Sequence, residues 1–279
     1  MKPQVIKTNY HTHTYLCKHA IGEASDYVKR AVELHYNVIA ITDHGPFTDE
    51  LAQIVHSRRM SLEAYQTMYL PSLQHAKQLF HQEIEVLSGV EIEYLHALDG
   101  LYPKFLKDMD LLILGQHYIV DDDGTYKSVY DRLTARQIEI YADTIVEALQ
   151  TGMFAILAHP EIYAWDKVVF DDDCKKAAEK IIDAAVKHHV VLEINANGIR
   201  NAIHFDKLLD GGQDFPYPRR AFWKMAKAKG AKVIINDDAH APNRIQDQYT
   251  FQAYQLAAEE GIEWLDDVDI QSFYSKRDE

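Results

Sequence analysis

Short apolar runs alternate along this chain with longer segments in which apolar positions recur at the spacing of a helix. Most of the short runs are rich in Val, Ile and Leu, which is typical of strands that are buried on both faces of a parallel sheet. We predict strands over seven runs, which cover residues 5–10, 38–41, 86–90, 111–114, 154–157, 190–194 and 233–235.

The segments between these runs predict amphipathic helices. We expect helices over five of them, which cover residues 24–34, 61–82, 134–149, 173–188 and 219–229. Thr134 is a suitable N-cap, and Gly152 and Gly230 lie just beyond the ends of two helices. Pro71 lies inside the second segment and would end or kink a helix, so we expect two helical pieces there.

The order of strands and helices predicts an α/β fold with a parallel sheet that is covered by helices. Polar residues able to bind metals follow nearly every predicted strand, and only a closed sheet brings so many strand ends around one point. We therefore predict a distorted (β/α)7 barrel, formed as a single domain over residues 1–279. Residues 45–59, 120–133 and 201–218 are expected to be irregular loops on the rim of the barrel.

Composition is compatible with this fold. The chain has 279 residues, of which 47% are hydrophobic, enough for one large core. It begins without an apolar leader and contains no run of about 18 apolar residues, so we expect a soluble, cytoplasmic protein that does not bind membranes. Cys17 and Cys174 are too few for a disulfide framework and are expected to be free thiols.

The net charge limits the range of partners. With 29 Lys and Arg against 43 Asp and Glu, the chain carries a formal charge of −14 and would repel nucleic acid. Bound divalent metals would reverse the charge at one location. A small phosphorylated substrate therefore stays compatible with an acidic protein.

The 15 histidines fall into two groups. Eight lie on predicted helical faces or in loops, where a structural or solvent-exposed role is the ordinary interpretation: His35, His56, His75, His81, His96, His188, His189 and His204. The other seven follow apolar strands by a few residues: His11, His13, His19, His44, His117, His159 and His240. Together with the acids Glu91 and Asp238 they exceed what one four-coordinate zinc can use, so we predict a cluster of two or three metals.

Other metal and phosphate motifs are absent from the sequence. There is no G-x-x-x-x-G-K-[ST] segment and no H-E-x-x-H segment, which excludes P-loop and zincin chemistry. The run from Asp121 to Gly124 lacks the alternating acids of a calcium-binding EF-hand loop.

The motifs from His11-Thr12-His13 to Asp238-Ala239-His240 resemble those of the PHP (polymerase and histidinol phosphatase) family of metal-dependent phosphoesterases. This resemblance implies a distorted seven-stranded barrel with three divalent metal ions, for which zinc, iron and manganese are all suitable. It also implies three ligand sets: His11, His13, Glu91 and Asp238; Glu91, His117 and His159; and His19, His44 and His240. Asp237 is the alternative to Asp238.

Further residues are candidates for catalysis or substrate binding. Asp43 could orient a histidine or donate a proton to the leaving oxygen. Arg200 is the first choice for a phosphate-binding cation, because it follows a predicted strand end and its stretch resembles the family's substrate-binding segment. The other candidates, each with a structural alternative such as a cap, turn or salt bridge, are Arg219, Arg220, Asn197, Glu161 and Glu193.

We interpret the chain as a phosphomonoesterase that resembles the stand-alone histidinol-phosphatases of the family and would hydrolyse L-histidinol phosphate. Two alternatives stay open: a hydrolase of another small phosphate or of a phosphodiester, and a non-catalytic metal-binding module. A phosphatase of the haloacid dehalogenase type is excluded, because no D-x-D-x-[TV] segment follows a predicted strand. The substrate's amine and imidazole would be complemented by acidic residues on the rim.

Overall fold

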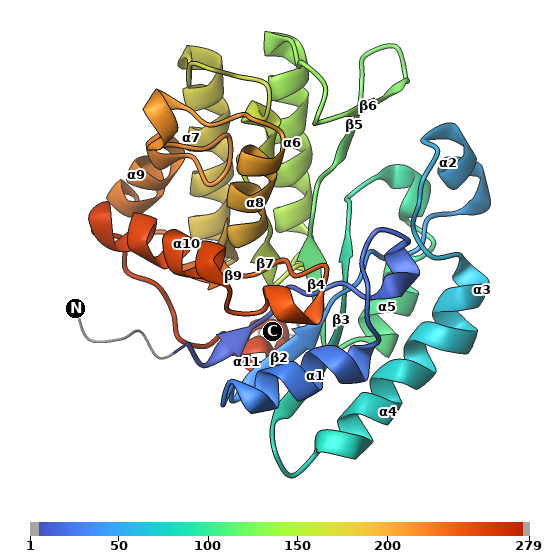
Figure 1. Ribbon diagram of the computed structural model, residues 1–279. Helices are drawn as coiled ribbons and strands as arrows, with labels where there is room; N and C mark the ends of the chain where they lie inside the picture. Colours follow the sequence, from blue (N-terminus) through green and yellow to red (C-terminus); the bar gives the residue numbers. More distant parts are fainter. Residues whose placement is uncertain (1–5, 276–279) are drawn as a thin grey trace.

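Seven parallel strands form the centre of the molecule in a computed structural model that describes residues 6–275 (Figure 1). They are hydrogen-bonded in the order β1 (Thr8–Asn9), β2 (Val38–Ile41), β3 (Glu85–Ile92), β4 (Leu111–Leu114), β7 (Ile156–Leu157), β8 (Val191–Asn195) and β9 (Val233–Asn236). Each corresponds to one of the seven predicted runs, and only residue 5 of those runs lies outside the described residues.

The first and last strands meet just beyond their ends. Thr12 and Ala239 form a parallel bridge, in which the backbone N–H of His13 donates to the carbonyl of Ala239 at 2.9 Å. The N–H of Ala239 donates to the carbonyl of His11 at 3.2 Å. These contacts make the sheet a nearly closed, distorted (β/α)7 barrel, as predicted.

Alternation along each strand separates the barrel interior from the layer under the helices. Val38 and Ala40 of β2 pack into an apolar cluster with Leu111 and Ile113 of β4. Residues 39 and 41 belong instead to the larger cluster that includes the buried faces of the helices. Both faces of each strand are thus buried, which explains why the strands are nearly continuous apolar runs.

Helices cover the outside of the sheet (Figure 1). Their bounds are α1 (Ala24–Glu33), α2 (Asp49–Ile54), α3 (Leu62–Ala64), α4 (Leu70–Phe80), α5 (Tyr102–Asp108), α6 (Ala135–Gln150), α7 (Asp172–Lys187), α8 (Ala196–His204), α9 (Arg220–Ala228), α10 (Gln248–Glu259) and α11 (Ile270–Ser275). The predicted N-cap Thr134 is confirmed, since its side chain accepts from the N–H of Gln137 in a capping box.

The predicted helical segment 61–82 consists of two α-helical pieces. A five-residue π-helical turn, Tyr65–Tyr69, separates α3 from α4. Pro71 lies in the first turn of α4, where its missing N–H costs no helical hydrogen bond. The prediction of two pieces at Pro71 is therefore confirmed.

The three predicted loops contain more regular structure than expected. Residues 45–59 include α2, and residues 120–133 include most of a hairpin formed by β5 (Tyr118–Val120) and β6 (Tyr126–Ser128). Helix α8 extends to His204, so the prediction of an irregular segment from residue 201 was wrong at its start. Helices α5, α10 and α11 lie outside the predicted elements.

Residues 265–274 pack against the amino-terminal ends of the strands, opposite the carboxyl ends where the predicted ligands lie. The N–H of Leu265 donates to the carbonyl of Val233, the first residue of β9, at 2.8 Å. Tyr274 accepts from the N–H of Leu112 at 2.9 Å and donates to the carbonyl of Met153 at 2.9 Å. This segment therefore covers the amino-terminal end of the barrel.

Two further expectations concern single features. Cys17 and Cys174 are both buried and unpaired, as predicted. Among the helices of residues 6–275, none has the length and apolar composition that crossing a membrane requires.

Gly198 in α8 packs so closely against Tyr217 that no side chain fits at this position. A Cβ at this position would lie 2.2 Å from the carbonyl oxygen of Tyr217 and 2.3 Å from its ring. We predict that Gly198→Ala destabilises the protein by about 1–3 kcal/mol or more, measured as a lower midpoint of thermal unfolding. Gly100→Ala is the matched control, because a Cβ there meets nothing within 4 Å; equal midpoints for both variants would contradict the predicted close packing.

Candidate metal centre

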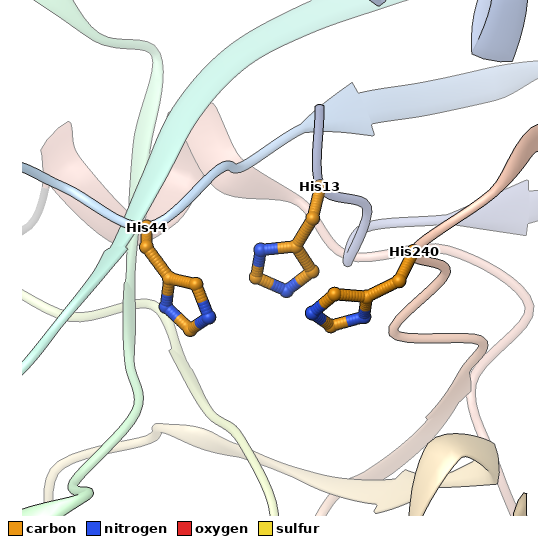
Figure 2. Close-up of side chains that lie close together, drawn as sticks. All are labelled: His13, His44 and His240. Carbon is orange, nitrogen blue, oxygen red and sulfur yellow. The ribbon is translucent and has the colours of Figure 1, made fainter. Parts of the chain in front are cut away.

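All nine predicted ligands lie at the carboxyl end of the barrel. Each belongs to a strand end or to the segment that follows it, and together they are His11, His13 and His19 after β1, His44 after β2, Glu91 in β3, His117 after β4, His159 after β7, and Asp238 and His240 after β9. Figure 2 shows how the rings of His13, His44 and His240 approach one another from three separate segments. The structure thus brings together residues up to 229 positions apart, from 11 to 240.

Glu91 lies in the middle of the cluster, and its two carboxylate oxygens face different histidines. Oε2 is 2.9 Å from His44 Nδ1 and 3.4 Å from His11 Nε2. Oε1 is 2.9 Å from His159 Nε2 and 3.6 Å from His117 Nε2. A carboxylate shared in this way between two groups of nitrogen ligands has the arrangement that a bridge between two metals requires.

Asp238 forms a second centre of contacts. Its Oδ1 lies 2.9 Å from His13 Nε2, 3.3 Å from His240 Nδ1 and 3.7 Å from His11 Nε2. Asp238 has a positive φ of 46°, an uncommon conformation for a residue with a side chain. The backbone is thus held in a strained region where the carboxylate meets the histidines.

Asp237, the alternative ligand, faces away from the cluster. Its carboxylate accepts from Asn9 Nδ2 at 3.0 Å and from the hydroxyl of Thr250. Burial raises the pKa of Asp237 to about 6. The contacts therefore favour Asp238 over Asp237 as the ligand.

Several buried polar atoms in this cluster have no hydrogen-bond partner among the described residues. They include His11 Nε2, His13 Nε2, His44 Nδ1, Glu91 Oε2 and Asp238 Oδ1. Buried polar atoms are nearly always paired, so a group of unpaired ones requires a specific explanation. Nitrogen and carboxylate oxygen atoms are the ligands that zinc, iron and manganese accept, so the donor set fits divalent cations.

The spacing of ligand atoms supports the same conclusion. Among residues 6–275, five sets of potential ligand atoms lie within 4.8 Å of one another, and three of them consist of predicted ligands alone: His13, His44 and His240; His11, His13 and Glu91; and His44, Glu91 and His117. The other two sets include Cys17. The rings of His13 and His240 are stacked with their centroids 4.2 Å apart. Burial holds the pKa of His44 and of His240 well below the usual value, which keeps these nitrogens neutral and able to bind a metal.

Without a bound cation, protonation of a histidine would balance part of the negative charge of the buried carboxylates. Burial opposes protonation of His13, but the adjacent carboxylates of Asp238 and Asp43 raise its pKa to about 9. Burial likewise opposes ionisation of Glu91, yet the adjacent His44 and His11 hold its pKa well below the usual range. Metal binding to His13 would therefore compete with a proton.

Two buried carboxylates support the ligands from behind. Glu193 Oε1 lies 2.8 Å from His11 Nδ1, and Glu93 Oε1 lies 2.9 Å from His117 Nδ1. In each case the other ring nitrogen, Nε2, faces Glu91. Such contacts fix the tautomer and orientation of a metal-binding histidine.

The two supporting carboxylates differ in how well the sequence revealed them. Glu193 was a candidate near the rim, whereas Glu93 was missed. The signal for Glu93 was its position two residues after Glu91, which places both side chains on the same side of an extended chain. Arg59, which donates to Glu93 from the loop after α2, was also missed.

Asp43 is fully buried and does not line the pocket beside the cluster. One oxygen accepts from the N–H of Thr14 at 3.1 Å, and the other lies 3.5 Å from His13 Nδ1. Glu161 is buried as well, and it accepts from Trp223 Nε1 at 2.6 Å and from the N–H of Arg219 at 3.0 Å. These contacts favour an orienting role for Asp43 and a structural role for Glu161.

All three guanidinium nitrogens of Arg200, the predicted phosphate-binding cation, form hydrogen bonds within the protein. Its Nε and Nη2 both donate to Asp247 at 2.9 Å, and its Nη1 donates to the carbonyl of Asp237 at 2.6 Å. These contacts, and its absence from the residues that line the pocket beside the cluster, do not support the prediction that Arg200 holds the phosphate. Its stretch does follow a strand, but α8 begins at Ala196 and directs this side chain toward the segment after β9 and the start of α10.

Arg219 and Arg220, the other candidate arginines, also pair with groups of the protein itself. The guanidinium of Arg219 lies 3.3 Å from Asp214 and donates to the carbonyl of Val168 at 2.7 Å. Arg220 pairs with Glu259 at 2.7 Å and with Glu260 at 2.8 Å. Neither Arg219 nor Arg220 lines the pocket beside the cluster, so the structure does not support them as substrate ligands.

A pocket of about 480 Å³ opens beside the cluster. Six predicted ligands form its floor: His19, His44, Glu91, His117, Asp238 and His240. The rim comprises His56, Ser57, Arg58, Arg59, Tyr118, Ser128, Tyr130, Asn197, Asn201 and Arg244. Of the predicted substrate-binding residues, only Asn197 lies here, with its Nδ2 3.3 Å from Asp238 Oδ2.

Comparison with known proteins places these features in a family. Residues 9–197 match the family model of the PHP domain, and the resemblance predicted from the motifs is confirmed. A probable phosphatase of Shewanella piezotolerans is 24% identical over 232 residues, which cover 82% of this chain and 76% of that protein. A probable histidinol-phosphatase of Deinococcus radiodurans is 23% identical over 241 residues, which cover 84% and 86% respectively.

A solved structure shares the fold. Histidinol phosphate phosphatase from Lactococcus lactis, in complex with zinc, L-histidinol and phosphate, superimposes with a TM-score of 0.67 at 16% sequence identity. The superposition covers 93% of this chain and 95% of that one. The predicted barrel is therefore confirmed by a known fold as well as by the strand order.

Gly115 provides the space that Glu91 occupies. A Cβ at position 115 would lie 1.9 Å from Glu91 Oε1, which is impossible without moving the carboxylate. We predict that Gly115→Ala loses at least one bound metal per chain, measured by elemental analysis of the purified protein. Gly100→Ala, where added atoms meet nothing, should keep the full metal content; unchanged metal in Gly115→Ala would remove Glu91 from the ligand set.

Glu93 is expected to tune metal affinity without binding the metal. We predict that Glu93→Gln weakens metal retention by about 10–100-fold, because His117 loses its charged acceptor. Competition with a chelator of known affinity measures this change. Glu85→Gln, at the exposed start of the same strand, is the control, and equal retention by both variants would show that Glu93 does not support His117.

Proposed function

We propose that this chain, a metal-dependent phosphatase that belongs to the PHP domain family, hydrolyses phosphate monoesters of small metabolites. The observation that carries the proposal is the convergence of nine predicted metal ligands, six of which line one pocket of about 480 Å³. A pocket of this size suits a small metabolite. The complete ligand set argues against a non-catalytic module.

The ligands divide into the three sets that the family resemblance implies. His11, His13, Glu91 and Asp238 would hold one divalent cation; Glu91, His117 and His159 a second; and His19, His44 and His240 a third. When bound, such cations polarise the phosphoryl oxygens and increase the acidity of a nearby water. The orphaned nitrogen and oxygen atoms of the cluster support this assignment.

The protein's own residues contribute position and electrostatics. Glu93 and Glu193 hold His117 and His11 in one orientation, so the ligands need little rearrangement when substrate binds. Arg59, which donates to Glu93 and lines the pocket, adds positive charge where a phosphoryl group would lie. Asp43 is shielded from the pocket, so we assign it to orienting His13 and not to proton transfer.

L-Histidinol phosphate is the specific substrate that the relatives support. The Deinococcus radiodurans relative and the Lactococcus lactis structure both carry a histidinol-phosphatase name, whereas the Shewanella piezotolerans relative is described only as a phosphatase. An acidic rim was expected to complement the amine of this substrate. Among the described residues that line the pocket, the only carboxylates are Glu91 and Asp238, and both face histidines. This observation favours a second candidate, a monoester whose alcohol is itself anionic.

We predict that the purified protein with Mn²⁺ or Zn²⁺ releases phosphate from small monoesters, including L-histidinol phosphate, and that EDTA abolishes the activity. Asp238→Asn should lower the turnover by at least about 100-fold, because a direct ligand matters more than a supporting one. Asp123→Asn, in an exposed loop, should keep full activity.

Two results would contradict this proposal. The absence of phosphate release from every monoester, with zinc, iron or manganese supplied, would exclude the activity. Faster cleavage of bis(p-nitrophenyl) phosphate than of p-nitrophenyl phosphate would indicate a phosphodiesterase instead.

A further inference from the structure

The rim of the pocket contains three arginines from two distant segments of the chain. Arg58 and Arg59 belong to the loop between α2 and α3, and Arg244 ends the 3-10 turn Pro242–Arg244 after β9. None of the three was predicted to bind substrate. All three line one pocket in a chain whose net charge is −14.

Arg58 and Arg244 differ from most of the arginines that the structure describes, six of which have an ion pair. Within residues 6–275, neither guanidinium has an ion pair or a hydrogen bond, whereas Arg136 and Arg220 each bind two acidic side chains. An arginine with no acidic partner beside a site for several cations adds repulsion, unless an anion lies between them. The arrangement therefore favours a negatively charged ligand.

The backbone that carries each of these two unpaired arginines is held in place by another arginine, whose guanidinium contacts several groups of the protein. Arg59, next to Arg58, binds Glu93, stacks over the ring of Phe47 at 4.4 Å and donates to the carbonyl of Gly45 at 3.4 Å. The loop is thus tied to the strand end that carries the metal-binding cluster.

Arg200 likewise holds the backbone of Arg244 in place. Its Nη2 donates to the carbonyl of Arg244 at 2.9 Å, while the rest of its guanidinium binds Asp247 and the carbonyl of Asp237. Two buried or half-buried arginines therefore fix the backbone from which two exposed arginines extend toward the pocket. Arg58 and Arg244 therefore extend from segments whose backbone is fixed by contacts with the rest of the protein.

The phosphoester group does not account for these charges. Its oxygens would be neutralised by divalent cations on the floor of the pocket. The other rim residues include the uncharged donors Ser57, Ser128 and Asn201, and within residues 6–275 the rim has no acidic side chain that could bind an amine. Arg58 and Arg244 are therefore available to the part of the substrate that extends away from the metals.

We infer, on the basis of the proposed phosphatase activity, that the alcohol moiety of the substrate carries a second negatively charged group, which Arg58 and Arg244 bind. A carboxylate and a phosphate both have the planar or forked oxygens that a guanidinium recognises. This chemistry distinguishes the substrate from an amino alcohol phosphate such as L-histidinol phosphate.

The experiment compares substrates that differ in one group. 3-Phosphoglycerate and glycerol 3-phosphate differ by a carboxylate, and fructose 1,6-bisphosphate and fructose 6-phosphate differ by a second phosphate. With the metal-loaded protein, we expect kcat/KM to be at least about tenfold higher for the more anionic member of one or both pairs. Which pair shows the larger ratio tells whether the group is a carboxylate or a phosphate. L-Histidinol phosphate should be the poorer substrate.

Variants assign the preference to the two arginines. Arg58→Gln and Arg244→Gln should each raise KM for the anionic member by about tenfold, with kcat and the neutral member little changed. The preference should also decline as salt increases, because the contacts are exposed to solvent. Arg136→Gln, an exposed arginine on α6 that does not line the pocket, is the matched control and should behave like the unmodified protein.

The outcomes separate this inference from the proposed function. Hydrolysis of all monoesters with no preference for anionic members, or fastest hydrolysis of L-histidinol phosphate, overturns the inference and leaves the phosphatase activity intact. An equal loss on neutral and anionic substrates in both variants shows that the arginines hold the phosphoester itself and also overturns it. No hydrolysis of any monoester overturns both.

Discussion

Buried nitrogen and oxygen atoms that have no partner of their own converge at the mouth of the barrel, and the rest of the structure keeps them there. Leaving such atoms unpaired away from water is costly, so the fold must supply this free energy or a cation must remove the cost. The apolar clusters on both faces of the sheet stabilise the frame against this local penalty. Glu91 has the most contacts of this kind, because it faces five histidines and occupies the space beside Gly115.

Supporting residues convert this convergence into a defined geometry. Glu193, Glu93 and Asp43 each lie beside the ring nitrogen of a histidine that faces away from the centre. Arg59 and Arg200 in turn connect the rim segments to these inner groups. The site is therefore organised in layers, in which the inner charged residues determine where the exposed residues lie.

The sequence revealed the frame and the ligands but not the rim. Strands could be predicted because burial on both faces makes them apolar throughout, and the ligands because each follows such a strand closely. Arg58 and Arg244 lie in long segments without periodicity, where nothing in the sequence indicates which side chains turn toward the pocket. The structure does not support the assignment of Arg200 for a related reason: its distance from a strand end could be predicted, but the direction of its side chain depends on where α8 begins. Glu93 was accessible from its spacing to Glu91 and was overlooked.

The bridge between Thr12 and Ala239 joins the segments that follow the first and last strands of the sheet, and this has a consequence for how the protein would acquire metals. A nascent chain that has not yet emerged beyond the last strand lacks both Asp238 and His240, and contacts between such distant residues form late and slowly. Partly synthesised or truncated chains would therefore hold an incomplete ligand set, so full cation uptake accompanies the final step of folding.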